Sequence, residues 1–191
     1  MDKKGRLAVL VAVIALIVSI GGIAFAALTT TLTITGGAEF TPANWDVKFT
    51  GTVNRTETGD ATGTIPTLTS TSVGTYSVVL TKPGDRVVYT FNVTNDGSID
   101  ARLAAFTKPN PVCTGTGTGA IADANMVCDN LIYTLAYSEA GNPLVMQNNT
   151  LATGQTRTLV LTIEYPMSMT TVPANEVIIQ FPQVTLLYEQ Q

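Results

Sequence analysis

The sequence contains no histidine, two cysteines and few charged residues, which make up 13% of its 191 positions. Without histidine there is no Ser-His-Asp or Cys-His catalysis, no zinc site with paired histidines and no imidazole general acid or base. Lys and Arg total 10 against 14 Asp and Glu, whereas nucleic-acid binding requires a basic surface. These deficits exclude histidine-dependent enzymes and argue against a nucleic-acid partner.

Several motifs of catalysis and cofactor binding are also missing. There is no Gly-x-Ser-x-Gly nucleophile elbow. The stretch Gly115–Gly119 looks superficially like a phosphate loop but lacks the Gly-Lys-Ser/Thr ending. Asp123, Asp129 and Glu139 are too scattered for a calcium loop. We therefore expect no catalytic residues, no metal, no cofactor and no small-molecule substrate.

The first 26 residues have the pattern of a secretory signal peptide. Three basic residues precede an uncharged run over residues 7–28, and Ala24 and Ala26 put small side chains where a signal peptidase reads them. Cleavage before Ala27 would leave residues 27–191, with seven basic against 13 acidic residues. The run also approaches the ~20 residues that span a bilayer, so a retained membrane helix is the alternative.

Cys113 and Cys128 lie in a connection rich in Gly and Thr. Outside the cytoplasm, two lone cysteines this close in sequence are expected to pair with each other. A metal site is the alternative, but two thiolates without histidine make an incomplete ligand shell. The sequence therefore predicts a Cys113–Cys128 disulfide.

Apolar residues recur at every second position along most of the chain after residue 27, which is typical of strands with one buried face. The alternating segments are 28–35, 45–50, 76–80, 87–94, 131–137, 158–165, 177–181 and 184–188. The alternation changes parity at Pro182, which predicts a bulge or a bend. Apolar faces must stack on one another, so the sequence predicts an all-β domain of seven to nine strands. We expect a two-sheet β-sandwich, jelly-roll or immunoglobulin-like.

Two Gly- and Thr-rich stretches, residues 51–75 and 109–128, are predicted to be loops, and no helix longer than about three turns is expected after residue 26. The single tryptophan, Trp45, alternates with Val47 and Phe49. This spacing favours a core position for the indole over an exposed sugar-stacking platform.

The leader that runs directly into Ala27-Leu28-Thr29-Thr30-Thr31-Leu32-Thr33-Ile34-Thr35-Gly36, followed by Trp45-Asp46-Val47, resembles the TasA/camelysin-like surface proteins. The resemblance implies a jelly-roll-like sandwich that is released by a specialised signal peptidase and polymerises into biofilm-matrix fibres on the cell surface. Camelysin-type members are described as metalloproteases, an activity that the lack of histidine does not allow us to carry over.

The leading hypothesis is therefore a secreted structural subunit that associates with itself into fibres by β-strand addition, and that meets the membrane only through its N-terminal segment before processing. In this hypothesis Leu28, Leu32 and Ile34 fill a groove on a neighbouring subunit. Residues 28–35 could instead form an edge strand of their own domain. Two further hypotheses are a membrane-anchored adhesin or binding module and a pilin-like subunit that keeps its helix.

Overall fold

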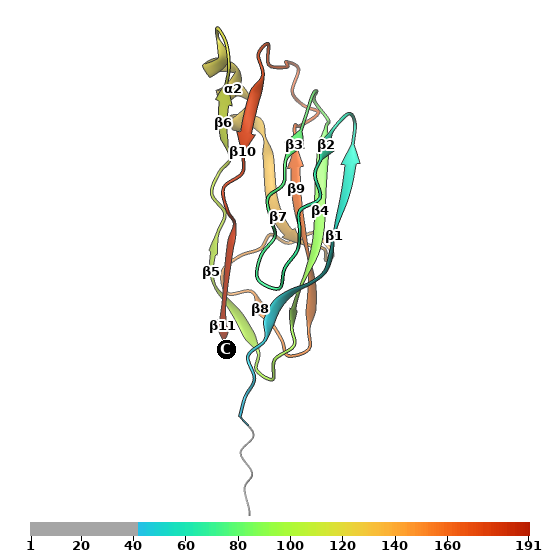
Figure 1. The fold of residues 1–191 in the computed structure, drawn as a ribbon, viewed down its shortest axis with the longest axis vertical. Coiled ribbons are helices and arrows are strands. Elements are labelled where there is room, and N and C mark those ends of the chain that lie inside the picture. The colour runs from blue at the N-terminus through green and yellow to red at the C-terminus, as the bar shows by residue number, and fades with distance from the viewer. Residues whose placement is uncertain (1–41) are drawn as a thin grey trace, which may run out of the picture. The chain divides into compact units, whose positions relative to one another are not determined.

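The computed structural model of the chain describes residues 42–191 (Figure 1). The predicted signal cleavage at Ala24, Ala26 and Ala27 and the N-terminal helix lie outside the described residues, as does the candidate donor strand. Across residues 42–191, every helix is too short or too polar to cross a membrane.

Strands dominate the described part of the chain, and one short helix interrupts them, so the all-β prediction is confirmed. The elements are β1 (Val47–Thr58), β2 (Thr62–Gly63), β3 (Val78–Val79), β4 (Arg86–Asn95), β5 (Ala101–Thr107), β6 (Val112–Gly115), α2 (Ala120–Asn130), β7 (Ile132–Tyr137), β8 (Thr150–Leu151), β9 (Thr156–Glu164), β10 (Val177–Gln180) and β11 (Thr185–Gln190).

Hydrogen bonding groups these strands into several antiparallel sheets. The largest has the order β1-β4-β9-β7, and a second has the order β11-β5-β8. β10 pairs with β6, and β2 pairs with β3. β6 follows β5 in the chain and β10 precedes β11, so the β10–β6 pair continues the β11–β5 pair toward the end of the molecule that carries α2 (Figure 1).

The core lies against one face of the four-stranded sheet. In β4, alternate residues from Val87 to Val93 are buried, while Thr90 and Asn92 between them stay half-buried on the other face. Leu103 of β5 and Leu151 of β8 belong to the same buried cluster, which therefore draws side chains from both larger sheets. This alternation is the period-two signal that was visible in the sequence.

The stretch 51–75, predicted to be a loop, begins as regular strand. β1 runs on to Thr58 at the edge of the sheet, and its register with β4 shifts between Thr50 and Asn54. Gly51 takes a φ of 76° there, a conformation that other residues rarely adopt. Most side chains in this half of β1 are polar and exposed. The segment therefore lacks the alternation of apolar residues that would predict a strand from sequence.

The stretch 109–128 also contains structure in place of the predicted loop, namely β6 and most of α2. The buried face of α2 consists of Ala120, Ala124 and Val127, which follow the spacing of a helix. Because two of the three side chains are alanines, the stripe is weak in sequence. At 11 residues the helix keeps within the predicted limit of about three turns.

A disulfide links Cys113 of β6 to Cys128 of α2, with their Cα atoms 5.9 Å apart, in agreement with the predicted pairing. Asn175 adds a second attachment, since its backbone N–H and its side-chain amide both donate to Oδ2 of Asp123, at 2.9 and 2.7 Å. The helix is therefore fastened both to β6 and to the connection that leads into β10.

Trp45 lies just before β1 and is 43% exposed, so the predicted core position is wrong. The alternation with Val47 and Phe49 extends to Trp45, two residues before the start of the strand, where the side chain lies beyond the edge of the core. Pro182 lies between β10 and β11, where a bulge or a bend was predicted. The strand is interrupted there, because β10 pairs with β6 and β11 pairs with β5.

Candidate functional site: an apolar groove beside a free strand edge

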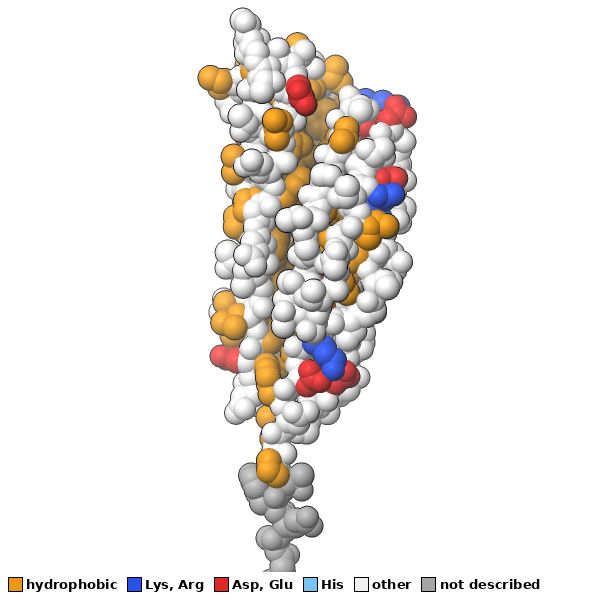
Figure 2. Space-filling model, viewed as in Figure 1, with side chains coloured by type: hydrophobic (Ala, Val, Ile, Leu, Met, Phe, Trp, Pro, Cys, Tyr) orange, Lys and Arg blue, Asp and Glu red, His pale blue; other side chains and the backbone are white. Residues whose placement is uncertain are grey.

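A groove of about 430 Å³ opens between the two larger sheets. Its floor is the apolar face of the four-stranded sheet, formed by Phe49, Phe91, Leu135 and Leu161, and its walls are residues 71–76 and 181–186. Figure 2 shows hydrophobic side chains along the seam beside β10 and β11, where most of the surrounding surface is neither apolar nor charged. Phe91, Leu135 and Leu161 of the floor are already almost fully buried, and Phe49 is half-buried, so a covering segment would gain free energy from the apolar surface that remains.

Aromatic rings close one part of the groove. The Tyr76 ring packs on Tyr89 and Phe181 with centroids 5.1 and 5.5 Å away, and Tyr133 packs on Phe181 at 5.1 Å. The Tyr76 and Tyr133 hydroxyl oxygens are 3.5 Å apart. Burial raises the pKa of both tyrosines, so both hydroxyls stay protonated at neutral pH.

Lys108 borders the same aromatic cluster. Its Nζ donates to the backbone carbonyl of Tyr133 at 2.9 Å and lies 4.3 Å from the centroid of the Tyr133 ring. Burial lowers the pKa of Lys108. The lysine therefore supports the wall of the groove, and its ammonium group has a partner within the fold.

The groove lies beside an unpaired edge of β11. This strand is hydrogen-bonded to β5 on one side, and across residues 42–191 no backbone hydrogen bond joins it to residues 71–76 opposite. That opposite wall is attached elsewhere, because the Phe49 N–H donates to the Ser70 carbonyl at 2.8 Å and Leu68 bridges to Val73. The backbone groups on the free side of β11 are thus available to another strand.

The first part of β11 has few of the features that protect exposed strand edges, whereas Glu189 and a shift of register between Leu187 and Tyr188 lie toward its C-terminal end. Residues 185–188 carry no charge and no proline, and Leu187 is 57% exposed. Proteins usually block such an edge with charges, bulges or covering segments. Residues 185–188 therefore leave the backbone on the free side of β11 able to pair with another strand.

The outer edges of the four-stranded sheet are protected. β1 carries Lys48, Arg55 and Glu57 together with the bulge at Gly51. β7 is covered by residues 143–145, since the Tyr137 N–H donates to Pro143 and the Val145 N–H donates to Leu135. The contrast with β11 marks the groove as the candidate site.

The acidic side chains within residues 42–191 make local contacts. No group of three or more Cys, Asp and Glu within residues 42–191 is arranged to hold a metal ion. Asp123 accepts the hydrogen bonds of Asn175, which lower the pKa of its carboxyl, and Glu139 pairs with Nε of Arg157 at 2.7 Å. These carboxylates serve the local fold.

The predicted donor residues lie outside the described part of the chain. They are Leu28, Leu32 and Ile34. The acceptor groove itself was not identified from sequence, because its walls come from two distant connections. The change of parity at Pro182 was the one signal near it, since Phe181 and residues 182–186 form one wall.

Comparisons with protein-family models, with curated proteins and with solved structures found no match. The function of the groove therefore has to be inferred from its own geometry.

Proposed function

We propose that this protein is a secreted structural subunit of a cell-surface or extracellular-matrix fibre, which assembles by β-strand addition. The observation that carries the proposal is the unpaired edge of β11 beside an apolar groove. In this proposal the two larger sheets form a β-sandwich in which one strand position is left for an incoming segment.

Strand addition accounts for both properties of the groove. An added strand exchanges main-chain hydrogen bonds with β11, and every second side chain turns inward. Those inward side chains would pack against the lining of the groove, where Phe49 and Leu186 are half-buried and Phe91 and Leu161 are almost fully buried. Burial of apolar surface contributes about 25 cal/mol per Å², so a few aliphatic side chains suffice to hold the segment.

The candidate donor is residues 28–35 of a neighbouring copy. Leu28, Leu32 and Ile34 occupy positions of equal parity and therefore share one face of an extended strand, while Thr31 and Thr33 occupy the other face. Signal cleavage before Ala27 would place this segment at the very start of the secreted chain. The same proposal accounts for the absence of charge and proline within the segment.

The test compares the secreted chain with variants of the donor segment by sedimentation velocity and electron microscopy. L32D/I34D should remain monomeric, because carboxylates cannot enter the apolar groove. The matched control T31D/T33D places the same charges on the opposite face and should assemble. Removal of residues 28–35 should leave a soluble monomer that a peptide of that segment stabilises.

Two results would count against the proposal. If the chain without residues 28–35 assembles as well as the intact one, strand donation by this segment is wrong. If the intact chain stays monomeric at every concentration while the peptide still stabilises the truncated chain, the segment is an edge strand of its own domain.

A further inference from the structure

Exposed apolar side chains also occur outside the groove, near the two ends of residues 42–191. Ile121 in α2 is 79% exposed, and Met167 and Val172 are also exposed. Trp45 belongs to the segment before β1, which lies at the opposite end of the long axis from α2 (Figure 1). Tryptophan is among the residues most enriched at the energetic centres of protein interfaces.

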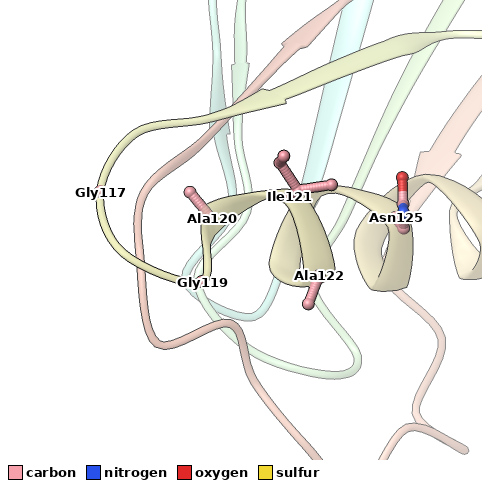
Figure 3. A pocket seen from close by; sticks show the side chains of 6 residues that line it. All are labelled: Gly117, Gly119, Ala120, Ile121, Ala122 and Asn125. Carbon is pink, nitrogen blue, oxygen red and sulfur yellow. The ribbon is translucent and has the colours of Figure 1, made fainter.

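The α2 end carries a shallow hollow of about 470 Å³ (Figure 3). Its lining consists of Gly117, Gly119, Ala120, Ile121, Ala122 and Asn125. Small side chains leave room for a large ring, and Ile121 supplies an apolar flank. Asn125, whose side chain forms no hydrogen bond within the described residues, offers a carbonyl oxygen that could accept from an indole N–H.

At the other end, the fold holds Trp45 on a fixed backbone. The Ser98 N–H donates to the Asn44 carbonyl at 2.9 Å, and the Asp96 N–H donates to the Asp46 carbonyl at 2.8 Å. Gly97 permits this contact, because a Cβ atom there would lie 2.6 Å from the Asn44 carbonyl oxygen. A side chain whose backbone is already fixed loses little entropy when it docks.

Strand direction determines which ends of two copies meet. β11 runs away from the α2 end toward the C-terminus (Figure 1). Antiparallel pairs outnumber parallel ones, so an added strand would run toward the α2 end of the acceptor and leave it there. Thr35 and Trp45 are ten residues apart and span about 35 Å at most when the chain is extended. Trp45 of the donor copy therefore lies within about 35 Å of the point where the added strand leaves the acceptor, on the side of α2.

We propose that neighbouring copies meet head to tail, with Trp45 of one copy docked in the hollow on the first turn of α2 of the next, against Ile121. The inference rests on the proposed strand addition, which sets the polarity. The two contacting surfaces are different, so the contact is heterologous and repeats along a line.

Cross-linking of paired cysteine variants tests the contact. A43C and A122C change exposed residues beside Trp45 and Ile121 and leave both of those side chains in place. A mixture of the two secreted proteins, treated with a short bis-maleimide, should give a cross-linked dimer that neither protein gives alone. The control mixture of A43C with T56C, an exposed position on β1, should give none.

A charge substitution provides a second measurement. I121K should raise the concentration at which half of the protein assembles by about tenfold, as expected for loss of one buried interface side chain. V79K changes an exposed valine of β3 that does not line the hollow; it is the control and should leave that concentration unchanged.

The outcomes separate this inference from the proposed function. If assembly requires residues 28–35 but the A43C–A122C pair gives no cross-link and I121K assembles normally, head-to-tail docking is wrong and strand addition stands. If assembly does not require residues 28–35 at all, the proposed function is wrong, and the cross-link alone then decides whether the two ends meet.

Discussion

At the scale of single residues, Asp85, which directly precedes β4, is a tightly constrained polar side chain. It is fully buried and accepts four hydrogen bonds, from the Thr81 N–H at 2.7 Å, the Thr81 hydroxyl at 2.9 Å, the Lys82 N–H at 3.1 Å and the Asp60 N–H at 2.9 Å. Burial opposes ionisation, but these donors outweigh it and hold the pKa of Asp85 below its ordinary value. The carboxylate thus ties the turn after β1 to the turn before β4.

We expect D85N to lower the free energy of unfolding by about 2–3 kcal/mol at pH 7, because an amide presents N–H groups to donors that need an acceptor. Since the pKa of Asp85 is lower in the folded than in the unfolded chain, its contribution is complete above about pH 4 and is lost as the pH falls through the folded value. Urea titrations at pH 7 and pH 3 measure the difference, which should shrink at pH 3.

The control for Asp85 is D96N, which removes an exposed carboxylate 3.0 Å from Nζ of Lys48. Exposed ion pairs contribute between 0 and about 1 kcal/mol, so this variant should unfold almost as the parent does. If D85N loses the same free energy of unfolding at both pH values, the stability depends on how the Asp85 side chain packs and not on its ionised carboxylate.

At the scale of elements, prediction from sequence worked for strands in which large apolar residues alternate over many positions, and it missed β5, where only Ala101 and Leu103 alternate as buried residues. β4, β7 and β9 fall within a few residues of the predicted segments, because alternation directly records which side chains point inward. It failed for α2, whose buried face is mostly alanine, and for the second half of β1, whose side chains are largely exposed. Prediction from sequence could not identify the groove, because no local residue pattern indicates that a strand position in a sheet is empty.

The disulfide gives a prediction for α2. C113S/C128S should lower the free energy of unfolding by roughly 3 kcal/mol, the chain-entropy value for a loop of about 15 residues. Hydrogen exchange should show faster exchange in α2, while amides in β4 and β9 stay protected. Unchanged exchange in α2 would mean that the buried Ala120, Ala124 and Val127 hold the helix without the bond.

The groove wall provides a matched pair of variants. Leu186 lines the groove, whereas its neighbour Leu187 points away from the core. L186D should abolish assembly and binding of the 28–35 peptide, because the carboxylate would lie where an added strand buries its side chains. L187D should retain both. Circular dichroism checks that each variant keeps its strand content, and equal behaviour of the two variants would place strand addition elsewhere.

At the scale of the whole molecule, net negative charge would oppose the proposed assembly. Residues 42–191 carry seven basic and 12 acidic side chains, so neighbouring copies repel at neutral pH. Raising the ionic strength from ~0.01 to ~0.15 M shortens the Debye length from about 30 to about 8 Å. We expect the assembly rate, followed by light scattering, to rise over this range. A fall would indicate that ion pairs, and not apolar contacts, hold the copies together.

If copies assemble by the proposed strand addition, the protected edge of β1 has a consequence for how the polymer grows. Its bulge near Gly51 and its charges at Lys48, Arg55 and Glu57 withdraw this edge of the four-stranded sheet from pairing. Each copy then has one acceptor and one donor, a valence of two, which yields unbranched chains. A copy that has lost its donor segment can still cap one chain end, so partial proteolysis of the N-terminus would act as a chain terminator and shorten the polymer.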